Sequence, residues 1–334
     1  MKKIGILTFH ASHNFGSMLQ AFALQKTLKK MGYLCQIINF RSKDQIENCS
    51  GVYQKPVRDL KGILRKLLLF PFRKELTEKH NRFERFLNDC LLCTPIYKTE
   101  QEVLKNCSDF DVYICGSDQI WNMKAKDFNW IYFLPFKNGK KIAYAPSAGD
   151  NTYLSNKDKV KELLSRFSAI CVREEKLSVV LSDLLPQKPT VLVDPTLLLL
   201  PEEWEKYISK EPIVKGDYLF LYSPYHMSDL VHIIPKDNKL PVVICSPLDL
   251  TCLYSPKYVK CLSSGPWDFL NLIYHSKGVV SGSFHAAVFA KLFKKPLYCI
   301  DMGKDSRINN LEIKFKNIEY EREAGLKFLQ DALK

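Results

Sequence analysis

His285 is the residue whose position in this sequence is hardest to explain by packing alone. It follows the buried strand predicted over Gly278–Ser281 and falls in the first turn of a helix of small residues, which Ser283 would cap. A histidine near the free N–H groups of a helix start can meet an anion or exchange a proton near neutral pH. His285 is therefore a candidate general acid, and Ser281 and Ser283 are candidate substrate contacts. The alternative is a core histidine with satisfied hydrogen bonds.

Arg173 is a second residue with a specific chemical use. It directly follows the apolar run Ala169–Val172, so it should lie at the carboxyl end of a buried strand. Ligands of open α/β sheets bind outside those ends, and the planar guanidinium matches phosphate or carboxylate. The competing interpretation is a surface ion pair with a neighbouring glutamate. Arg307, in a polar run that begins at Lys304, could supply a further cation from a nearby loop.

The turn after the first apolar run places polar residues directly before a helix. This turn, HASHNFGS at 10–17, contains Asn14 and Gly16. Gly16 permits close approach of the backbone, and the free N–H groups of a helix start can bind an anion. Asn14 and Gly16 are therefore candidate substrate contacts, although many turns between a strand and a helix look alike.

A comparable turn, GSDQIWN at 116–122, follows another buried strand. Gly116, Ser117 and Trp121 suit a sugar or acid pocket. Asp118 could orient or deprotonate an acceptor hydroxyl. The alternative is a simple turn in which Asp118 caps a helix.

Apolar runs typical of buried strands alternate with helical patterns along the chain. The N-terminal part begins with a strand, a turn containing glycine, a helix over Ser17–Met31 and a second strand, which together make a βαβ unit. We therefore predict an α/β protein with parallel, doubly wound sheets. The predicted strands are Lys3–Phe9, Leu34–Phe40, Val112–Cys115, Lys141–Ala145, Ala169–Val172, Thr190–Val193, Tyr218–Tyr222, Pro241–Cys245, Gly278–Ser281 and Pro296–Ile300.

A stretch rich in Pro, Glu and Lys at 195–216 separates two series of strands. We predict an N-terminal domain over residues 1–200, on the acceptor side, and a C-terminal domain over residues 201–334, on the donor side. Two Rossmann-like sheets that face each other resemble the GT-B architecture, with the reaction in the cleft between the domains. A basic helical insertion near residues 55–90 interrupts the first domain.

That insertion is rich in Leu and Phe as well as in Lys and Arg. One interpretation is a pair of amphipathic surface helices, broken near Pro71, whose apolar residues pack on the sheet. The other is a membrane-surface helix with one apolar face and one basic face. We favour the first and predict that the apolar face, including Leu67–Phe70, is mainly buried against the N-terminal domain.

The charge balance limits the class of partner. The chain has 49 Lys and Arg against 36 Asp and Glu, a formal net charge of +13. The basic residues are spread out and form no aromatic-interleaved motif of a known nucleic-acid module. Phosphorylated small substrates and an anionic membrane surface therefore explain the charge better than nucleic acid does.

The cysteines and the hydropathy favour a cytoplasmic protein, with peripheral contact at the inner face of the membrane as a further expectation. Eleven cysteines are scattered through strands and helices, as expected of small buried hydrophobes in a reducing compartment. Cys90 and Cys93 form one CxxC without a second pair or a nearby histidine at zinc spacing, so helix packing is favoured over a metal or redox role. No window approaches the about 20 apolar residues of a membrane span.

Taken together, these segments resemble the polysaccharide pyruvyl transferase family. The matching stretches follow the family order and span nearly the whole chain: GILTFHASHNFGSMLQAFALQ, FDVYICGSDQIWN, KIAYAPSAG, ICVREEKLS, VLVDPTLLL and SGSFHAAVFAKLFKKP. The resemblance implies a GT-B-like fold and transfer of the enolpyruvyl unit of phosphoenolpyruvate to a sugar, which forms a cyclic pyruvate ketal. It also implies a cell-surface polysaccharide precursor as acceptor, often on a lipid carrier, and neither a cofactor nor a metal.

The resemblance assigns roles to particular residues. Arg173 matches an arginine implicated in gripping phosphoenolpyruvate, and His285 matches the histidine of the motif at the helix start. Well-studied members carry an arginine two residues before that histidine, where this sequence has Ser283. A donor-binding charge is therefore missing, and Arg307 is the residue that we expect to supply it.

Two other functions remain open at this point. A glycosyltransferase that uses a nucleotide sugar would share the architecture and the phosphate-binding helix start. A carbohydrate-binding homologue without activity is the non-enzymatic alternative, which Ser283 could indicate.

Overall fold

The computed structural model describes residues 2–49, 51, 53, 55, 57, 59–149, 154–224, 227–247, 249–299, 311 and 314–334. Arg307, the candidate second cation, lies outside these residues, so its role stays a prediction.

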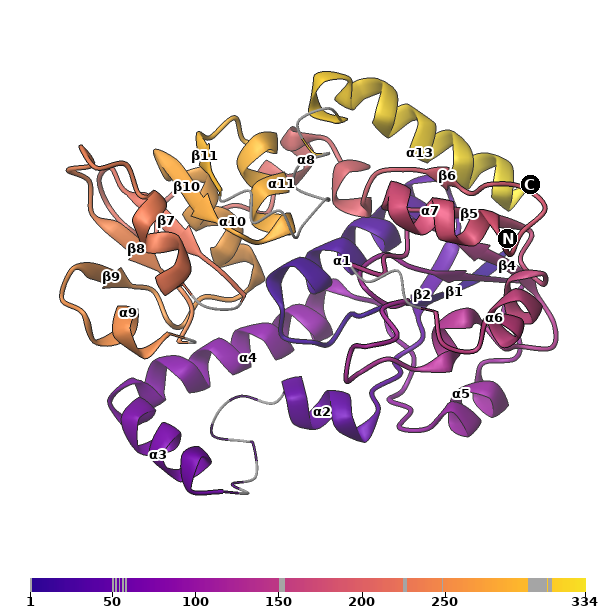
Figure 1. Cartoon of the computed structure of the whole chain (residues 1–334), viewed down its shortest axis with the longest axis horizontal. Coiled ribbons are helices and arrows are strands. Elements are labelled where there is room, and N and C mark those ends of the chain that lie inside the picture. The colour runs from indigo at the N-terminus through magenta and orange to yellow at the C-terminus, as the bar shows by residue number, and fades with distance from the viewer. Residues whose placement is uncertain are drawn as a thin grey trace.

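The first sheet has, within the described residues, six parallel strands in the order β2-β1-β3-β4-β5-β6 (Figure 1). Its strands are β1 (Lys3–Leu7), β2 (Leu34–Ile37), β3 (Val112–Cys115), β4 (Lys140–Ala143), β5 (Ala169–Val172) and β6 (Thr190–Val191). One apolar cluster lies on each face of this sheet, because successive side chains of a strand point to opposite faces. Its helices are α1 (Phe15–Lys30), α2 (Lys43–Cys49), α5 (Glu100–Asn106), α6 (Lys157–Leu164), α7 (Glu175–Ser182) and α8 (Pro201–Glu205).

The second sheet has, in the part that the structure describes, five parallel strands in the order β11-β10-β7-β8-β9. Its strands are β7 (Leu219–Tyr222), β8 (Val242–Ile244), β9 (Tyr258–Lys260), β10 (Gly278–Ser281) and β11 (Leu297–Tyr298). The helices that accompany it are α9 (Leu250–Tyr254), α10 (Pro266–Tyr274) and α11 (Phe284–Leu292). Short 3-10 helices occur in the connections of the chain at η1 (Phe70–Phe72), η2 (Trp130–Phe133), η3 (Pro195–Leu197) and η4 (Ser228–Ile233).

Each sheet has a point where the direction of strand addition reverses. In the first sheet β1 lies between β2 and β3, and in the second sheet β7 lies between β8 and β10. Loops that leave the carboxyl ends of such neighbours diverge and open a crevice, which is where ligands of doubly wound sheets bind. Ser117 directly follows the Gly116 turn after β3, and His285 follows β10, so both candidates lie at these points.

Helix α1 fills the centre of the interface between the two sheets (Figure 1). Phe15 stacks on Phe269 of α10, with ring centroids 4.5 Å apart and ring planes at 7°. Phe22 meets the edge of Trp267 at 5.2 Å. One apolar cluster therefore runs through α1 from the first domain into the second.

The insertion after β2 forms α3 (Leu60–Leu69) and α4 (Arg73–Cys90), separated by η1 at Pro71. The predicted break is confirmed. The predicted burial of the apolar face against the N-terminal domain is confirmed for α4, where Phe83, Phe86 and Leu87 are buried around α1, but it is wrong for Leu67, Leu68 and Phe70. Leu67 is 65% exposed, Leu68 36% and Phe70 61%, whereas Leu69 is fully buried. The reason is position, because α3 protrudes from the body beyond the end of α4 (Figure 1).

The buried residues of the insertion face both domains. Phe83, Phe86 and Leu87 of α4 join the large cluster around α1. Leu69 and Leu76 instead pack in a small cluster with Leu253 and Leu262 of the second domain. Helix α4 thus bridges the two halves.

The C-terminal helix α13 (Ile318–Leu333) returns to the first sheet, where Figure 1 draws it in yellow. Arg322 Nε donates a 2.9 Å hydrogen bond to the carbonyl oxygen of Leu197, and the Phe328 ring lies 6.1 Å from that of Tyr144. The last part of the predicted C-terminal domain therefore packs on the N-terminal half.

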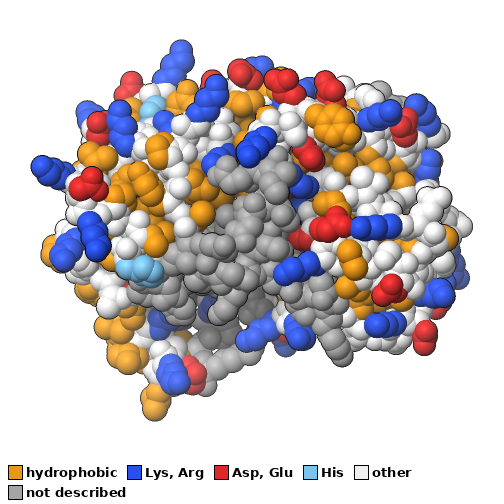
Figure 2. Space-filling view, turned by 45° about the horizontal axis from the view of Figure 1, so that its top comes forward, with side chains coloured by type: hydrophobic (Ala, Val, Ile, Leu, Met, Phe, Trp, Pro, Cys, Tyr) orange, Lys and Arg blue, Asp and Glu red, His pale blue; other side chains and the backbone are white. Residues whose placement is uncertain are grey.

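The surface carries mixed charge. On the face in Figure 2, Lys and Arg side chains are dispersed and stand among Asp and Glu rather than forming one basic patch. Within the described ranges, no helix combines the length and the apolar composition that crossing a membrane requires.

Candidate active site

His285 lies in the first turn of α11, as the sequence indicates. Ser283 is the N-cap of that helix, and its hydroxyl accepts a long, 3.5 Å hydrogen bond from the N–H of Ala286. The Ser281 hydroxyl donates to the Tyr222 carbonyl at 2.6 Å and accepts from the Ser283 N–H at 3.0 Å. Both serines therefore shape the turn that presents His285, and the hydroxyl of Ser281 is fully buried in that role.

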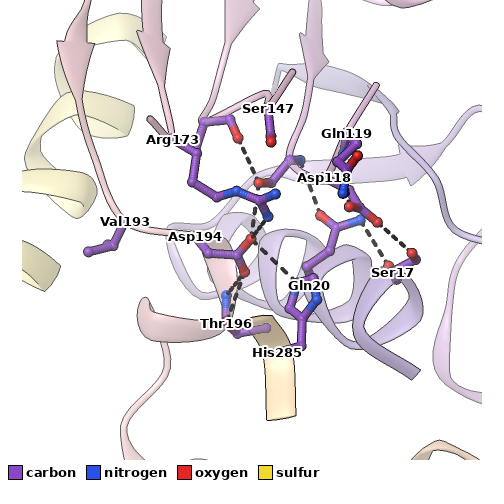
Figure 3. A network of polar contacts seen from close by, with 12 residues as sticks. Ser17, Gln20, Asp118, Gln119, Ser147, Arg173, Val193, Asp194, Thr196 and His285 are labelled. Carbon is purple, nitrogen blue, oxygen red and sulfur yellow. Dashed lines mark hydrogen bonds and ion pairs between the residues drawn. The ribbon is translucent and has the colours of Figure 1, made fainter. Parts of the chain in front are cut away.

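Asp194 is the centre of a buried polar network that the sequence did not reveal (Figure 3). One carboxylate oxygen accepts from the N–H and hydroxyl of Thr196, at 3.0 and 2.8 Å. The other accepts from Arg173 Nη1 at 2.8 Å and from the Ser117 hydroxyl at 3.1 Å, and lies 3.6 Å from His285 Nε2. This carboxylate thus joins candidates from β5, from the turn after β3 and from α11.

The charges at Asp194 stabilise one another. Burial would raise the pKa of Asp194, but the contact with His285 and the charge of Arg173 hold it well below its usual range. Asp194 is therefore a carboxylate at neutral pH, and it can hold the His285 imidazole in one orientation.

Arg173 is buried, which corrects the interpretation of a surface ion pair. Its Nε donates to Glu174 Oε1 at 3.2 Å, and its guanidinium carbon lies 4.7 Å from the centre of the Phe284 ring. Burial disfavours the guanidinium charge, but Glu174 and Asp194 outweigh it and raise the pKa of Arg173. Glu174 is held in turn by the hydroxyl of Ser147.

Two nitrogen atoms of this network make no hydrogen bond. Among the described residues, Arg173 Nη2 and His285 Nε2 are buried without a hydrogen-bond partner. A buried polar atom left in this way costs free energy, so an anionic ligand that accepts from both would be stabilised.

A small cavity of ≈ 20 Å³ opens beside Arg173 and is also lined by Asp194, Phe284 and Lys314. Lys314 Nζ donates to the carbonyl of Leu192 at 3.2 Å, and burial lowers its pKa. The structure therefore brings a second cation to Arg173, although Ser283 stands where the resemblance implies an arginine.

The start of α1 lies next to His285. Asn14 is its N-cap and accepts from the N–H groups of Gly16 at 2.9 Å and Ser17 at 3.3 Å. Those N–H groups are therefore already occupied, which weakens the interpretation of Asn14 as a substrate contact. Gly16 instead adjoins the His285 ring.

The polar side chains of the turn after β3 mostly bind other protein groups, which leaves them little capacity to bind a ligand. Gly116 has φ +113°, and a Cβ there would come within 2.1 Å of the Tyr144 carbonyl oxygen, so its role is conformational. Besides contacting Asp194, the Ser117 hydroxyl donates to Ala145 at 2.6 Å. Asp118 accepts from the hydroxyl of Ser17 and from the N–H of Gln119, so it does not cap a helix.

Trp121 is a core residue and not a substrate contact. Its ring is 1% exposed and stacks on Phe133 at 5.0 Å, and its indole N–H donates to the Tyr132 carbonyl at 3.2 Å. The apolar neighbours explain the error, because a tryptophan after a buried strand suits a core as well as a pocket.

A larger cavity of ≈ 260 Å³ lies on the N-terminal side. Asp118 is not among the residues that line it, whereas Asp127 is, and burial raises the Asp127 pKa. The lining residues come from the loops after β1 and β2, from α2 and α4, and from η2 and the segment before it: Thr8, Phe9, His10, Ala11, Ser12, His13, Phe40, Arg41, Gln45, Ile46, His80, Glu84, Asp127 and Tyr132.

Comparison with known proteins agrees with this geometry. The family model "Polysaccharide pyruvyl transferase" matches residues 14–303, which include Arg173, Asp194 and His285. The chain belongs to the polysaccharide pyruvyl transferase family. It is therefore a transferase of polysaccharide biosynthesis. No curated protein matches the chain.

Solved structures support the two-domain fold. A UDP-N-acetylglucosamine 2-epimerase from Rickettsia bellii aligns with 9% identity over 99% of this chain and 96% of that chain, with a TM-score of 0.50. An alpha-glucosyltransferase in complex with UDP and a 13-mer DNA aligns with 12% identity, coverage of 98% and 95%, and the same TM-score of 0.50. The S. aureus MnaA-UDP co-structure gives 10% identity, coverage of 96% and 91%, and again 0.50. At such identities the likeness concerns the GT-B fold alone.

Three residues of these cavities were not predicted from the sequence: Asp194, Lys314 and Asp127. Asp194 follows β6 in the run VLVDPT, and a carboxylate directly after a strand was the available signal. Lys314 lies outside any strand-turn motif, and Asp127 lies in an irregular segment. Only tertiary structure brings these two residues to the cavities.

Proposed function

We propose that this polysaccharide pyruvyl transferase homologue transfers the enolpyruvyl unit of phosphoenolpyruvate to two hydroxyls of a sugar and releases phosphate. The observation that carries the proposal is a pair of buried nitrogen atoms without hydrogen bonds, Arg173 Nη2 and His285 Nε2, on either side of Asp194. A ligand with phosphate and carboxylate groups supplies hydrogen-bond acceptors for these atoms.

The donor substrate is bound by Arg173 and Lys314. Arg173 offers a planar group to phosphate or carboxylate, and Lys314 lines the same small cavity. Since this cavity of ≈ 20 Å³ is far smaller than phosphoenolpyruvate, the donor site must widen when the donor binds.

His285 acts as the general acid. It protonates the methylene carbon of phosphoenolpyruvate, which leaves C2 cationic, and a sugar hydroxyl adds at C2 with loss of its proton. The C2–O bond to phosphate then breaks and phosphate leaves with the bonding electrons, which makes C2 cationic again, and the second hydroxyl adds there with loss of its proton to close the ketal. Asp194, whose carboxylate oxygen lies 3.6 Å from His285 Nε2, orients the imidazole.

The sugar acceptor occupies the larger cavity beside the β1–α1 loop. Its volume of ≈ 260 Å³ is close to the lower end of the about 300–1,000 Å³ typical of small-molecule sites. Asp127 lines it and can accept the proton of an attacking hydroxyl, a role that the sequence had given to Asp118. Tyr132 offers an aromatic wall.

The acceptor is carried on a lipid, and α3 brings the protein to the membrane surface. Leu60 is 81% exposed, Leu64 57% and Leu67 65% on this protruding helix. Lysines and arginines stand between them in LKGILRKLLL, which suits an anionic lipid surface.

The test is phosphate release from phosphoenolpyruvate with a panel of activated or lipid-linked sugars. Thermal melting with phosphoenolpyruvate and with UDP-sugars, added separately, distinguishes the proposal from a nucleotide-sugar glycosyltransferase. We expect only phosphoenolpyruvate to raise the melting temperature. Stabilisation by a UDP-sugar alone, together with its consumption, would replace pyruvyl transfer by glycosyl transfer. Binding of sugar without phosphate release from any acceptor would favour an inactive carbohydrate-binding homologue.

A further inference from the structure

Two histidines and a glutamate meet at the wall of the larger cavity, away from the Asp194 network. His80 and Glu84 stand four residues apart on α4, so they share one face of that helix. His13 reaches them from the β1–α1 loop, where its backbone has a φ of 47°. All three residues line the cavity.

Their ligand atoms are close enough to share one ion. One ring nitrogen from each histidine and one oxygen of Glu84 all lie within 4.8 Å of one another. His13 Nε2 and Glu84 Oε1 are 2.6 Å apart. In a tetrahedral zinc site with bonds of about 2.0–2.1 Å, ligand atoms are about 3.3 Å apart. Small side-chain rotations therefore suffice to move these three atoms to metal-binding distances.

The present contacts leave one of these rings with an unused atom. Among the described residues, His80 Nδ1 is a buried polar atom without a hydrogen-bond partner. The His13 ring stacks on Phe83 at 5.1 Å and lies 4.8 Å from the His80 ring. This packing holds His13 beside His80, although two imidazoles gain little from each other without a shared proton or cation.

The surroundings hold the glutamate in place. Arg41 Nη1 lies 3.9 Å from Glu84 Oε2, and Arg41 Nε donates to Asn39 Oδ1 at 2.8 Å. The Arg41 charge opposes a cation, whereas Asp127, which lines the same cavity, partly offsets it. Glu84 Oε1 remains the oxygen that faces His13.

We infer that His13, His80 and Glu84 form a binding site for a divalent first-row transition metal ion, with zinc as the best match. Two imidazoles and one carboxylate are a ligand set that zinc accepts, and three protein ligands leave one coordination position free. The free position faces the cavity, where water or an oxygen of a bound molecule can occupy it. The three residues lie outside the Arg173–Asp194–His285 network but line the cavity proposed for the acceptor, so the metal is tested by direct binding and not by turnover.

The experiment is calorimetric titration of the metal-stripped full-length chain with ZnCl₂. We expect one ion per chain, and a weakening of roughly 100-fold in His80→Ala, which removes a ligand, and in Glu84→Gln, which replaces the carboxylate by a neutral amide. Glu84→Gln keeps the size and an oxygen acceptor for His13, so it isolates the loss of the charge. His232→Ala, which alters an exposed histidine outside the site, should bind zinc as the wild type does.

Two further measurements secure the assignment. Circular dichroism verifies that each variant is folded, and Co²⁺ in place of Zn²⁺ reports a four-coordinate site by its absorption spectrum. Absence of stoichiometric zinc binding by the wild type would overturn the inference. So would unchanged binding in both folded site variants. Loss of binding only in Cys90→Ser/Cys93→Ser would assign the ion to that cysteine pair instead.

Discussion

The backbone of Gly16, at the start of α1, lies directly against the imidazole of His285, at the start of α11. A Cβ atom on Gly16 would come within 2.0 Å of His285 Nδ1 and 2.3 Å of its Cγ. These helices accompany different sheets, so the contact joins the two domains at the candidate active site. The sequence suggested that Gly16 allows an anion to approach the backbone. In the structure, the absence of a side chain at Gly16 leaves room for the His285 ring instead.

Gly16→Ala adds a single methyl group, but we expect it to displace the His285 ring and to lower activity strongly. We expect phosphate release to fall at least about tenfold and the free energy of unfolding to fall by about 1–3 kcal/mol, because the new methyl group must displace the ring or the helix. The matched control is Gly282→Ala, where the nearest atom to a new Cβ is Leu230 Cδ2 at 3.8 Å. Similar activity of Gly16→Ala and wild type would show that α1 and α11 can move apart at this contact without loss of function.

His285→Gln should abolish turnover and keep the fold. A general acid contributes about 10²–10⁴-fold, and glutamine retains hydrogen bonding but cannot donate a proton in the same way. Phosphate release with circular dichroism measures both effects, and His232→Gln is the control at an exposed histidine. A folded His285→Gln enzyme with the wild-type rate would sink the assignment.

Arg173→Lys should weaken binding of phosphoenolpyruvate at least tenfold. The lysine keeps one positive charge for Asp194, but it loses the planar group that holds two oxygens at once. Wild-type affinity should also fall steeply with added salt. Calorimetry measures both, with Arg166→Lys at an exposed helix ion pair as the control. Equal affinity in Arg173→Lys and wild type would exclude bidentate binding by Arg173, and equal affinity in Arg173→Ala would remove the residue from the donor site.

Asp194→Asn should destabilise the protein by up to about 3–5 kcal/mol at pH 7, because it removes one of the two buried carboxylates that pair with the buried Arg173 charge. The folded-state pKa of Asp194 is lowered, so its stabilisation is complete above the unfolded carboxyl pKa of about 3.9 and is lost as pH falls below it. The difference between wild type and Asp194→Asn in urea unfolding should therefore shrink below about pH 4. Asp237→Asn, at an exposed loop, controls for the loss of one charge. A difference that stays constant down to pH 2 would contradict the depressed pKa.

Leu64→Ser/Leu67→Ser should reduce binding to vesicles of anionic and zwitterionic phospholipid without unfolding the protein. Both leucines lie on the exposed face of α3, at 57% and 65% exposure, so little packing is lost. Leu69→Ala at the fully buried neighbouring position should instead cost about 2–5 kcal/mol of stability. Cosedimentation and thermal melting separate the two effects. Vesicle binding that is equal in wild type and the double variant would remove α3 from the membrane contact.

The sequence alone determined ten of the eleven strands that the structure describes, and their order along the chain. Val112–Cys115, Ala169–Val172 and Gly278–Ser281 were predicted with the bounds that the structure has, because a strand buried on both faces reads as an unbroken apolar run. β9 (Tyr258–Lys260) was missed, since it is short, at the sheet edge and only partly buried. Their positions directly after buried strands also identified Arg173 and His285 as candidate site residues.

Tertiary structure decided which of those residues meet. Asp194 and His285 lie in different domains and 91 positions apart in the chain, yet they lie 3.6 Å apart in space. In the folded protein Trp121 is part of the core, although the sequence favoured a ligand contact. Helix α3 is exposed, although the sequence favoured its burial. The sequence pattern shows that a side chain is apolar or that it follows a strand. It does not show which residues of distant segments pack against that side chain, and those neighbours decide whether it serves packing, binding or catalysis.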